Sequence, residues 1–152
     1  MRRSVLSALA VCAVTLFSAA AYAETTPADA IKYRKAIMSA MAAHVGAFLL
    51  VNMGKVEHQD HLKTHANALA DLGAQARVVF PAGTDAGDTD ALPLIWQEQE
   101  QEQFKQLLTK LETSSAQIRD AVAANNKAGT MTAFKSLGEA CKGCHDRYRT
   151  PD

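Results

Sequence analysis

Apolar residues recur every three or four positions along most of the chain from residue 27 onward, which is the spacing of helices with one inward face. The first helix is expected over residues 27–52, because Thr26 can cap it and Pro27 suits its first turn. Gly54 follows the expected end. The predicted inward stripe of this helix is Ile31, Arg34, Met38, Met41, Val45 and Phe48.

The same spacing predicts three further helices, over residues 59–76, 93–125 and 130–148. A loop rich in glycine, aspartate and threonine separates the second from the third at residues 79–92. The stripe of the last helix is Phe134, Leu137, Cys141, Cys144 and Tyr148. No segment alternates as a strand would, so the fold class expected is all-α, an antiparallel four-helix bundle.

The first 23 residues are expected to lie outside this bundle. A basic start at residues 2–3, an apolar run over residues 5–17 and a small-x-small site at residues 21–23 together predict a secretory signal peptide, residues 1–23, cleaved after Ala23. The apolar run is shorter than the ~20 residues that span a bilayer. The mature chain, residues 24–152, is therefore expected in the periplasm.

The charge balance excludes one broad class of function. The signal peptide holds two of the sixteen basic residues and none of the sixteen acids, so the mature chain carries a net charge of −2. A nucleic-acid-binding protein would show a basic stripe, and none is present. No second apolar segment is long enough to cross a membrane, so no membrane insertion of the mature chain is expected.

The strongest chemical signal is the motif Cys-x-x-Cys-His at Cys141, Cys144 and His145. Two cysteines at this spacing add to the haem vinyl groups as thioethers, and the adjacent histidine becomes an axial ligand of the iron. On a helix these three positions share one face, so all three side chains can reach one flat ring. The motif predicts one covalent haem c, placed inside the bundle near the last helix.

Other uses of the two cysteines fit the sequence less well. A redox Cys-x-x-Cys is expected beside a βαβ pattern, which is absent. A structural zinc site needs four ligands, and no second pair of cysteines exists in the mature chain. No nucleophile–base pair is apparent either, so an enzyme is not expected.

The order of these motifs resembles the cytochromes c′, the class II c-type cytochromes, over essentially the whole mature chain. The resemblance rests on Tyr33-Arg34, on the loop from Phe80 to Asp88, on Ile95-Trp96 and on the haem motif near the C-terminus. It implies that His145 is the proximal iron ligand, that Arg34 meets a haem propionate and that Arg149 sits close to His145. It also implies, with less support from the residues, that Lys35 and Asp88 lie near the haem edge.

The position that decides function is the distal side of the iron. In five-coordinate cytochromes c′ an apolar residue, often leucine, covers it, and here Met38 stands at that position. Because a thioether can ligate haem iron, the sequence favours a six-coordinate, low-spin branch with His145 and Met38 as metal ligands and electron transfer to unidentified redox partners. Met41, one turn further, is the rival ligand. The alternative is a five-coordinate protein that binds nitric oxide or carbon monoxide.

Two further patterns remain open. Relatives in the resembling family pair through their first two helices, and the small residues Ala40, Ala43 and Ala47 would permit such a homodimer. His58, His61 and His65 recur at helical spacing with Asp60 beside them, which could bind zinc or copper. A solvated helix face is favoured there, because no fourth ligand is evident.

Overall fold

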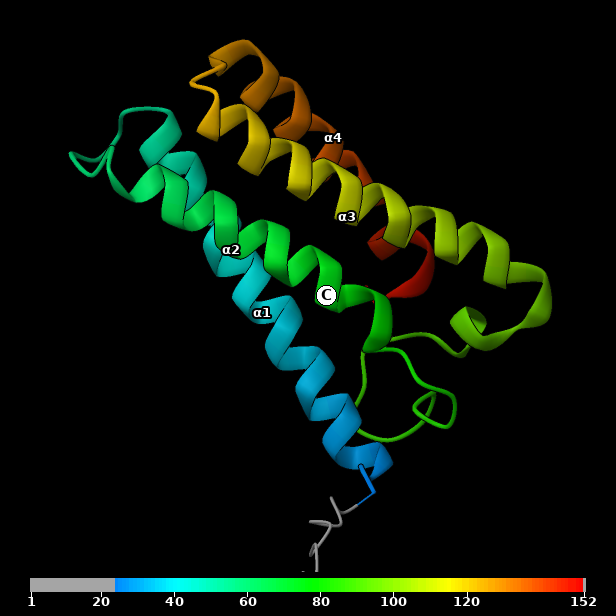
Figure 1. Cartoon of the computed structure of the whole chain (residues 1–152). Coiled ribbons are helices and arrows are strands. Elements are labelled where there is room, and N and C mark those ends of the chain that lie inside the picture. The colour runs from blue at the N-terminus through cyan, green and yellow to red at the C-terminus, as the bar shows by residue number, and fades with distance from the viewer. Residues whose placement is uncertain (1–23, 152) are drawn as a thin grey trace, which may run out of the picture.

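A computed structural model describes residues 24–151; the predicted signal peptide lies outside the described residues. The described part contains four long helices, α1 (Pro27–Asn52), α2 (His61–Gln75), α3 (Gln101–Ala123) and α4 (Lys127–Tyr148). They run alternately up and down, and Figure 1 shows α1 beside α2 and α3 beside α4. The four-helix bundle predicted from the spacing is confirmed.

Three of the helix pairs hold the bundle together. α1 packs on α2, α2 on α3 and α3 on α4. The backbones of α1 and α4 are not in contact. In the described residues, no Cα atom of one helix lies within 8 Å of a Cα atom of the other. The bundle is therefore open along the side where its first and last helices face each other.

Helix α1 begins where the sequence predicts. The Thr26 hydroxyl accepts a hydrogen bond from the Asp29 backbone N–H at 3.2 Å, and Pro27 occupies the first turn. Ile31, Arg34 and Met41 of the predicted stripe are buried, as is Phe48 at its far end.

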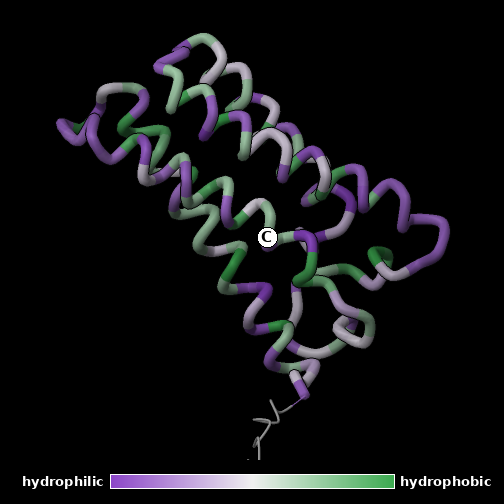
Figure 2. Tube along the Cα trace, in the orientation of Figure 1, coloured by the Kyte–Doolittle hydropathy of each residue, from purple (hydrophilic) through white to green (hydrophobic). Residues whose placement is uncertain are grey.

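Contrary to the expectation that no second apolar segment is long enough, α1 has the length and composition of a helix that could cross a membrane, and only 22 % of its most apolar stretch is buried within the chain. Figure 2 shows apolar colour along much of its length. Its outer face is therefore less polar than the outer face of an ordinary bundle helix. An apolar outer face on α1 is as compatible with packing against the helices of a second copy of the chain as with contact to a lipid surface.

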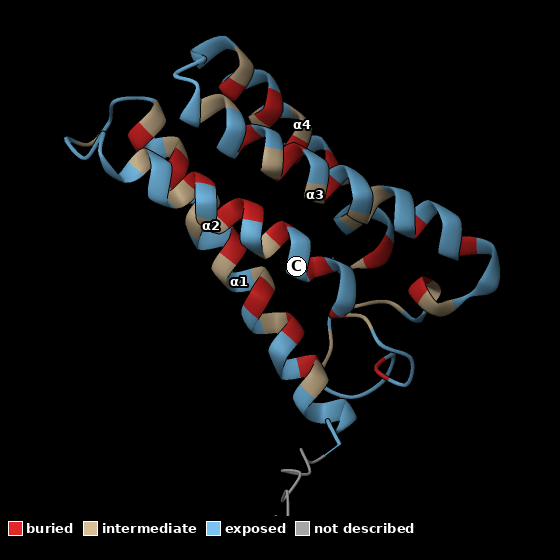
Figure 3. Cartoon of the chain, viewed as in Figure 1, coloured by how far each residue is buried: buried red, intermediate tan, exposed pale blue. Residues whose placement is uncertain are grey.

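The core lies between the inner faces of the helices, where the buried residues cluster in Figure 3. Phe48 is fully buried and stacks on Phe134 of α4 with ring centroids 5.4 Å apart. Gly73 of α2 lies so close to Ser115 of α3 that a Cβ at that position would overlap the serine side chain. The Phe48–Phe134 stack fixes the end of the bundle away from the open side near residues 34–45, and the close approach of Gly73 to Ser115 joins α2 to α3.

The third helix starts later than the sequence predicts. Residues Pro93–Trp96 and Glu98–Glu100 form two short 3-10 helices, η2 and η3, and the α-helix begins at Gln101. The alternating glutamines and glutamates at residues 97–103 suggest a solvated helix face, and that interpretation is wrong at Glu100. The Glu100 side chain is buried and accepts hydrogen bonds from Arg147 at 2.6 and 2.8 Å and from the Tyr148 hydroxyl at 2.8 Å.

This network predicts a pH dependence of stability. Hydrogen bonds from Arg147 and Tyr148 lower the pKa of Glu100 from its ordinary value of 4.5. A carboxyl with a lowered folded-state pKa stabilises the fold above its unfolded pKa, and that stabilisation is lost as pH falls through the folded value. We expect Glu100→Gln to lower the thermal midpoint at pH 7, and the difference from the unmodified chain to shrink steadily below about pH 4.5.

The matched control for this measurement is Glu102→Gln, because Glu102 is exposed in the first turn of α3. Its thermal midpoint should follow that of the unmodified chain at every pH. A Glu100→Gln deficit that stayed constant down to pH 3 would contradict the assignment of the effect to the Glu100 carboxylate.

Candidate functional site

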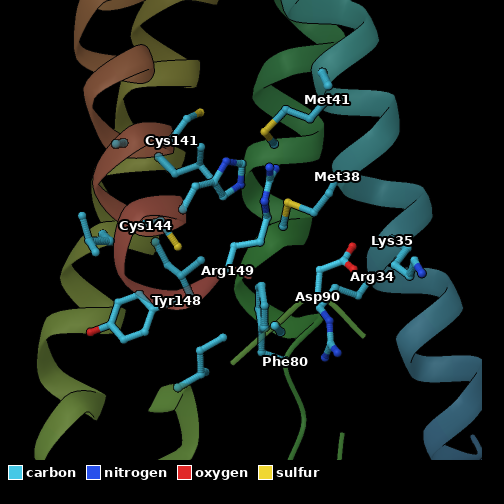
Figure 4. Close-up of a pocket in the computed structure, with 18 of the residues that line it drawn as sticks. Arg34, Lys35, Met38, Met41, Phe80, Asp90, Cys141, Cys144, Tyr148 and Arg149 are labelled. Carbon is cyan, nitrogen blue, oxygen red and sulfur yellow. The ribbon is translucent and has the colours of Figure 1, made fainter. Parts of the chain in front are cut away.

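A cavity of about 490 Å³ occupies the open side of the bundle, between α1 and α4. Its volume lies in the range of sites that enclose a cofactor or ligand. Residues of α1, α3, α4 and the segment before η2 line it, and Figure 4 shows their side chains converging from both sides. Most of the lining is apolar, including Leu107, Leu108 and Leu111 on the floor formed by α3.

The haem motif forms the α4 wall of this cavity. Cys141, Cys144 and His145 all line it, as positions three and four apart on one helix face should. The glycine inside the motif, Gly143, has a packing reason, because a Cβ there would lie 3.3 Å from a methyl carbon of Leu107. The spacing therefore places both thiols and the imidazole against one ligand volume.

The two thiols are neutral at physiological pH. Burial raises the pKa of Cys144 to about 11, and it raises the pKa of Cys141 as well. No disulfide joins the two cysteines. Metal binding and nucleophilic attack need the thiolate, so the cavity disfavours a zinc site or a catalytic cysteine.

The α1 wall faces the motif with two thioethers. Met38 is half-buried and Met41 is buried, and Figure 4 shows both side chains extending from α1 toward α4. Ser39, Ala42 and Val45 also line the cavity from this side. The predicted distal residue is therefore on the side of the cavity opposite the motif, and its predicted rival is beside it.

Arg34 lies at the edge of the same cavity and is 3 % exposed. Its guanidinium donates to the Thr84 hydroxyl at 2.8 Å, the Thr84 carbonyl at 3.0 Å and the Thr89 hydroxyl at 2.7 Å, with a longer bond to the Val79 carbonyl. Every one of these oxygens is neutral. The ion pairs of the described residues include no carboxylate for Arg34.

A buried cation without an anion is costly, and burial accordingly lowers the pKa of Arg34. The rings of Phe80 and Trp96 lie 5.2 and 5.7 Å from the guanidinium carbon and offset part of that cost. A carboxylate of a ligand in the cavity would offset the rest. The propionate partner inferred from the family resemblance fits this environment.

Of the remaining predicted residues, Arg149 and Lys35 line the cavity and Asp88 does not. Arg149 lines the cavity, and in Figure 4 its side chain extends into the space between α4 and Met38. Lys35 also lines the cavity, but Asp88 does not: its carboxylate is exposed and pairs with Lys35 at 3.1 Å. Asp90 lines the cavity too, although the sequence does not predict it, since no periodic pattern places a loop residue.

The site thus combines three features that haem c requires. It offers two neutral thiols and an imidazole on one wall, an apolar volume, and a buried cation at the rim. The residues that would hold the group are Cys141 and Cys144 by covalent bonds, His145 by ligation and Arg34 by charge. The site therefore fits the predicted cofactor.

Comparison with known proteins decides the family. The family model described as "Cytochrome C'" matches residues 29–149. The chain belongs to the cytochrome c′ family. It is 32 % identical over 124 residues to the cytochrome c′ of Alcaligenes xylosoxydans xylosoxydans, a match that covers 81 % of this chain and 94 % of the relative.

Solved structures of the family share the fold. Cytochrome c prime from Shewanella frigidimarina matches with a TM-score of 0.76 and 32 % identity, over 85 % of this chain and all of that chain. A nitric oxide complex of a variant of cytochrome c prime from Alcaligenes xylosoxidans matches with a TM-score of 0.73 and 31 % identity, over 83 % of this chain and 98 % of that chain. As a member of this family the chain is a c-type cytochrome with covalent haem c.

Proposed function

We propose that the protein is a periplasmic cytochrome c′ that binds a neutral diatomic gas, nitric oxide or carbon monoxide, at its haem iron. The observation that carries this proposal is the largely apolar wall that α1 presents to the cavity across from α4, made of Met38, Met41, Ala42 and Val45 with the hydroxyl of Ser39 among them. In this site the haem iron would supply the position at which the gas binds. His145 would hold the iron from the α4 side.

The chemistry of the α1 wall selects for small uncharged molecules. Transfer of a charged or strongly hydrated ligand into an apolar pocket costs several kcal/mol, whereas a neutral diatomic molecule loses little on leaving water. A methionine side chain adapts its shape readily because it has three rotatable bonds. Met38 can therefore shield the distal side and still move aside for a small ligand.

The comparison with the Alcaligenes xylosoxidans protein supports this function over the six-coordinate prediction. Variants of that protein have solved structures with bound nitric oxide and with bound carbon monoxide. The family match covers every residue of the haem motif in this chain. We therefore propose that this chain is a gas-binding haem protein and not an enzyme.

A second function rests on Met38 itself. Its thioether extends from α1 toward α4, the helix that carries His145, so ligation by both residues would close both axial positions of the iron. Iron with histidine and methionine ligands is typical of electron carriers. In that case the protein would pass single electrons between redox partners and would exclude gases.

The two functions give opposite results in one experiment. We expect the absorption spectrum of the reduced holoprotein to shift on addition of carbon monoxide, and Met38→Leu to change the dissociation constant of the gas by less than about tenfold, equivalent to ~1.4 kcal/mol. Met41→Leu serves as the matched control, because it changes the neighbouring thioether on the same wall.

If Met38 ligates the iron, the unmodified protein keeps its spectrum under carbon monoxide. Met38→Leu alone, and not Met41→Leu, would then create a gas-sensitive spectrum. A protein in which only Met41→Leu has that effect would assign ligation to Met41.

The outer face of α1 and α2 supports a homodimer as the assembled form. The small residues Ala36, Ala40 and Ala43 lie on the poorly buried side of α1, together with exposed Leu50. Small side chains allow two helices to approach closely, and the apolar character of α1 favours burial of this face. The proposed pairing runs through the first two helices, and the periplasmic location rests on the predicted signal peptide and the family.

A further inference from the structure

Four of the five histidines of the chain gather on α1, on α2 and in the segment that connects them. The rings of His58 and His61 stack with centroids 4.9 Å apart, and those of His61 and His65 lie 6.4 Å apart. The ring of His65 in turn lies 5.2 Å from that of His44 on α1. The four imidazoles therefore form a continuous row across three segments of the chain.

One end of this row has the donor set of a metal site. His58, Asp60 and His61 each offer one ligand atom, and these atoms all lie within 4.8 Å of one another. Donors around a tetrahedral ion lie roughly 3.3 Å apart, given metal–ligand distances of about 2.0–2.2 Å. All three side chains are exposed, so rotation of their outer bonds can close the remaining gap without moving the helices.

At the other end of the row, the fold brings together two histidines whose contact the sequence does not predict. The sequence places His44 apart on the first helix, but the fold brings its Nδ1 to 3.0 Å from Nδ1 of His65. One of these two rings donates and the other accepts, so this hydrogen bond requires at least one neutral imidazole.

A histidine held by a second side chain through one ring nitrogen presents the other nitrogen in a fixed tautomer. Such partners are typical of metal-ligating histidines, where their removal weakens binding by about 10–100-fold. His65 follows His61 by one helical turn, the spacing at which two histidines on a helix can share one ion. His44 thus has the position of an orienting partner for a ligand on α2.

We propose that His58, Asp60, His61 and His65 form a surface site for a divalent transition-metal cation of the zinc and copper class, with His44 positioning His65. Nitrogen and carboxylate donors in this ratio suit such ions better than they suit calcium or magnesium, which prefer oxygen ligands. None of the five residues lines the haem cavity, so the site is separate from the gas-binding function and does not depend on it.

The test is a calorimetric titration of the intact holoprotein with zinc chloride in a buffer that does not bind zinc. We expect one zinc ion per chain. The double variant His58→Ala/His61→Ala should lose at least tenfold in affinity, and His44→Gln should lose about tenfold through His65. Because His58, Asp60 and His61 are exposed, these variants should fold, which their unchanged haem spectrum and thermal midpoint would verify.

Two carboxylates provide the matched control. Asp60→Asn should weaken zinc binding, whereas Glu57→Gln, which alters an exposed neighbour outside the donor set, should leave it unchanged. The proposal is overturned if the unmodified protein binds no zinc at millimolar concentration, or if the double histidine variant binds it equally well. A stoichiometry of one ion per two chains, with dimers held by zinc, would also overturn the site, because the four ligands would not then come from one chain.

Discussion

The chain should lose all covalently bound haem when Cys141 and Cys144 are both replaced by alanine. Both thiols line the cavity beside His145, and the two thioether bonds are the only covalent links that the motif predicts. The measurement is haem-dependent staining of the protein after denaturing electrophoresis, following expression in a host that matures c-type cytochromes. The expected result is a band for the unmodified chain and none for the double variant.

The structure adds a second expectation for this variant. Since the backbone of α1 stays apart from that of α4, a group in the cavity would add contacts between these two helices on the open side of the bundle. Loss of the tether should therefore lower the thermal midpoint and increase hydrogen exchange in the middle of α1, while the Phe48–Phe134 end of the bundle stays protected. This pattern would distinguish loss of the cofactor from general unfolding.

The control is Lys142→Ala, which changes a residue inside the motif without removing a haem bond. Lys142 is exposed, and its ion pair with Asp146 at 2.6 Å is a surface pair of little energetic value. It should retain the haem band and the thermal midpoint. A disulfide between Cys141 and Cys144 in the unmodified periplasmic protein, without bound haem, would contradict the assignment of the motif.

The sequence predicts the helices of this protein well where caps or regular apolar spacing mark them. Thr26 and Pro27 mark the start of α1, and the three-and-four spacing of apolar residues identifies its inner face. The same spacing fails at residues 93–100, where buried Glu100 holds two 3-10 turns against the end of α4. A pairing between residues 47 positions apart leaves no local pattern from which it could be read.

Some residues of the candidate site can likewise be predicted from local spacing, and others depend on contacts between distant segments. The haem motif is local, so its three residues and their shared helix face follow from spacing alone. The position of Asp90 and the hydrogen bond between His44 and His65 depend on how loops and separate helices meet. The sequence also does not identify the distal ligand, since Met38 and Met41 both lie in the cavity wall on the same face of α1.

Replacement of Arg34 should also change the stability of the fold strongly, because Arg34 lines the cavity and holds the loop at residues 79–92 by hydrogen bonds. Its guanidinium holds residues 79–89 by hydrogen bonds to Thr84, Thr89 and the Val79 carbonyl. Arg34→Met should cost about 3–5 kcal/mol, because four hydrogen bonds are lost and the buried acceptor oxygens of the loop are left without their donor. That cost corresponds to a fall of roughly 10–20 °C in the thermal midpoint for a chain of this size.

Two substitutions separate the roles of Arg34. Arg34→Lys keeps the charge that a propionate would need but loses the forked set of donors, so we expect a midpoint between those of Arg34→Met and the unmodified chain. Lys35→Met changes the adjacent residue, whose ion pair with exposed Asp88 is worth at most about 1 kcal/mol. Limited proteolysis should cut the loop at residues 79–92 in Arg34→Met and leave it intact in Lys35→Met. Equal midpoints for the two methionine variants would mean that the loop is held by its own turns and that Arg34 serves the cavity alone.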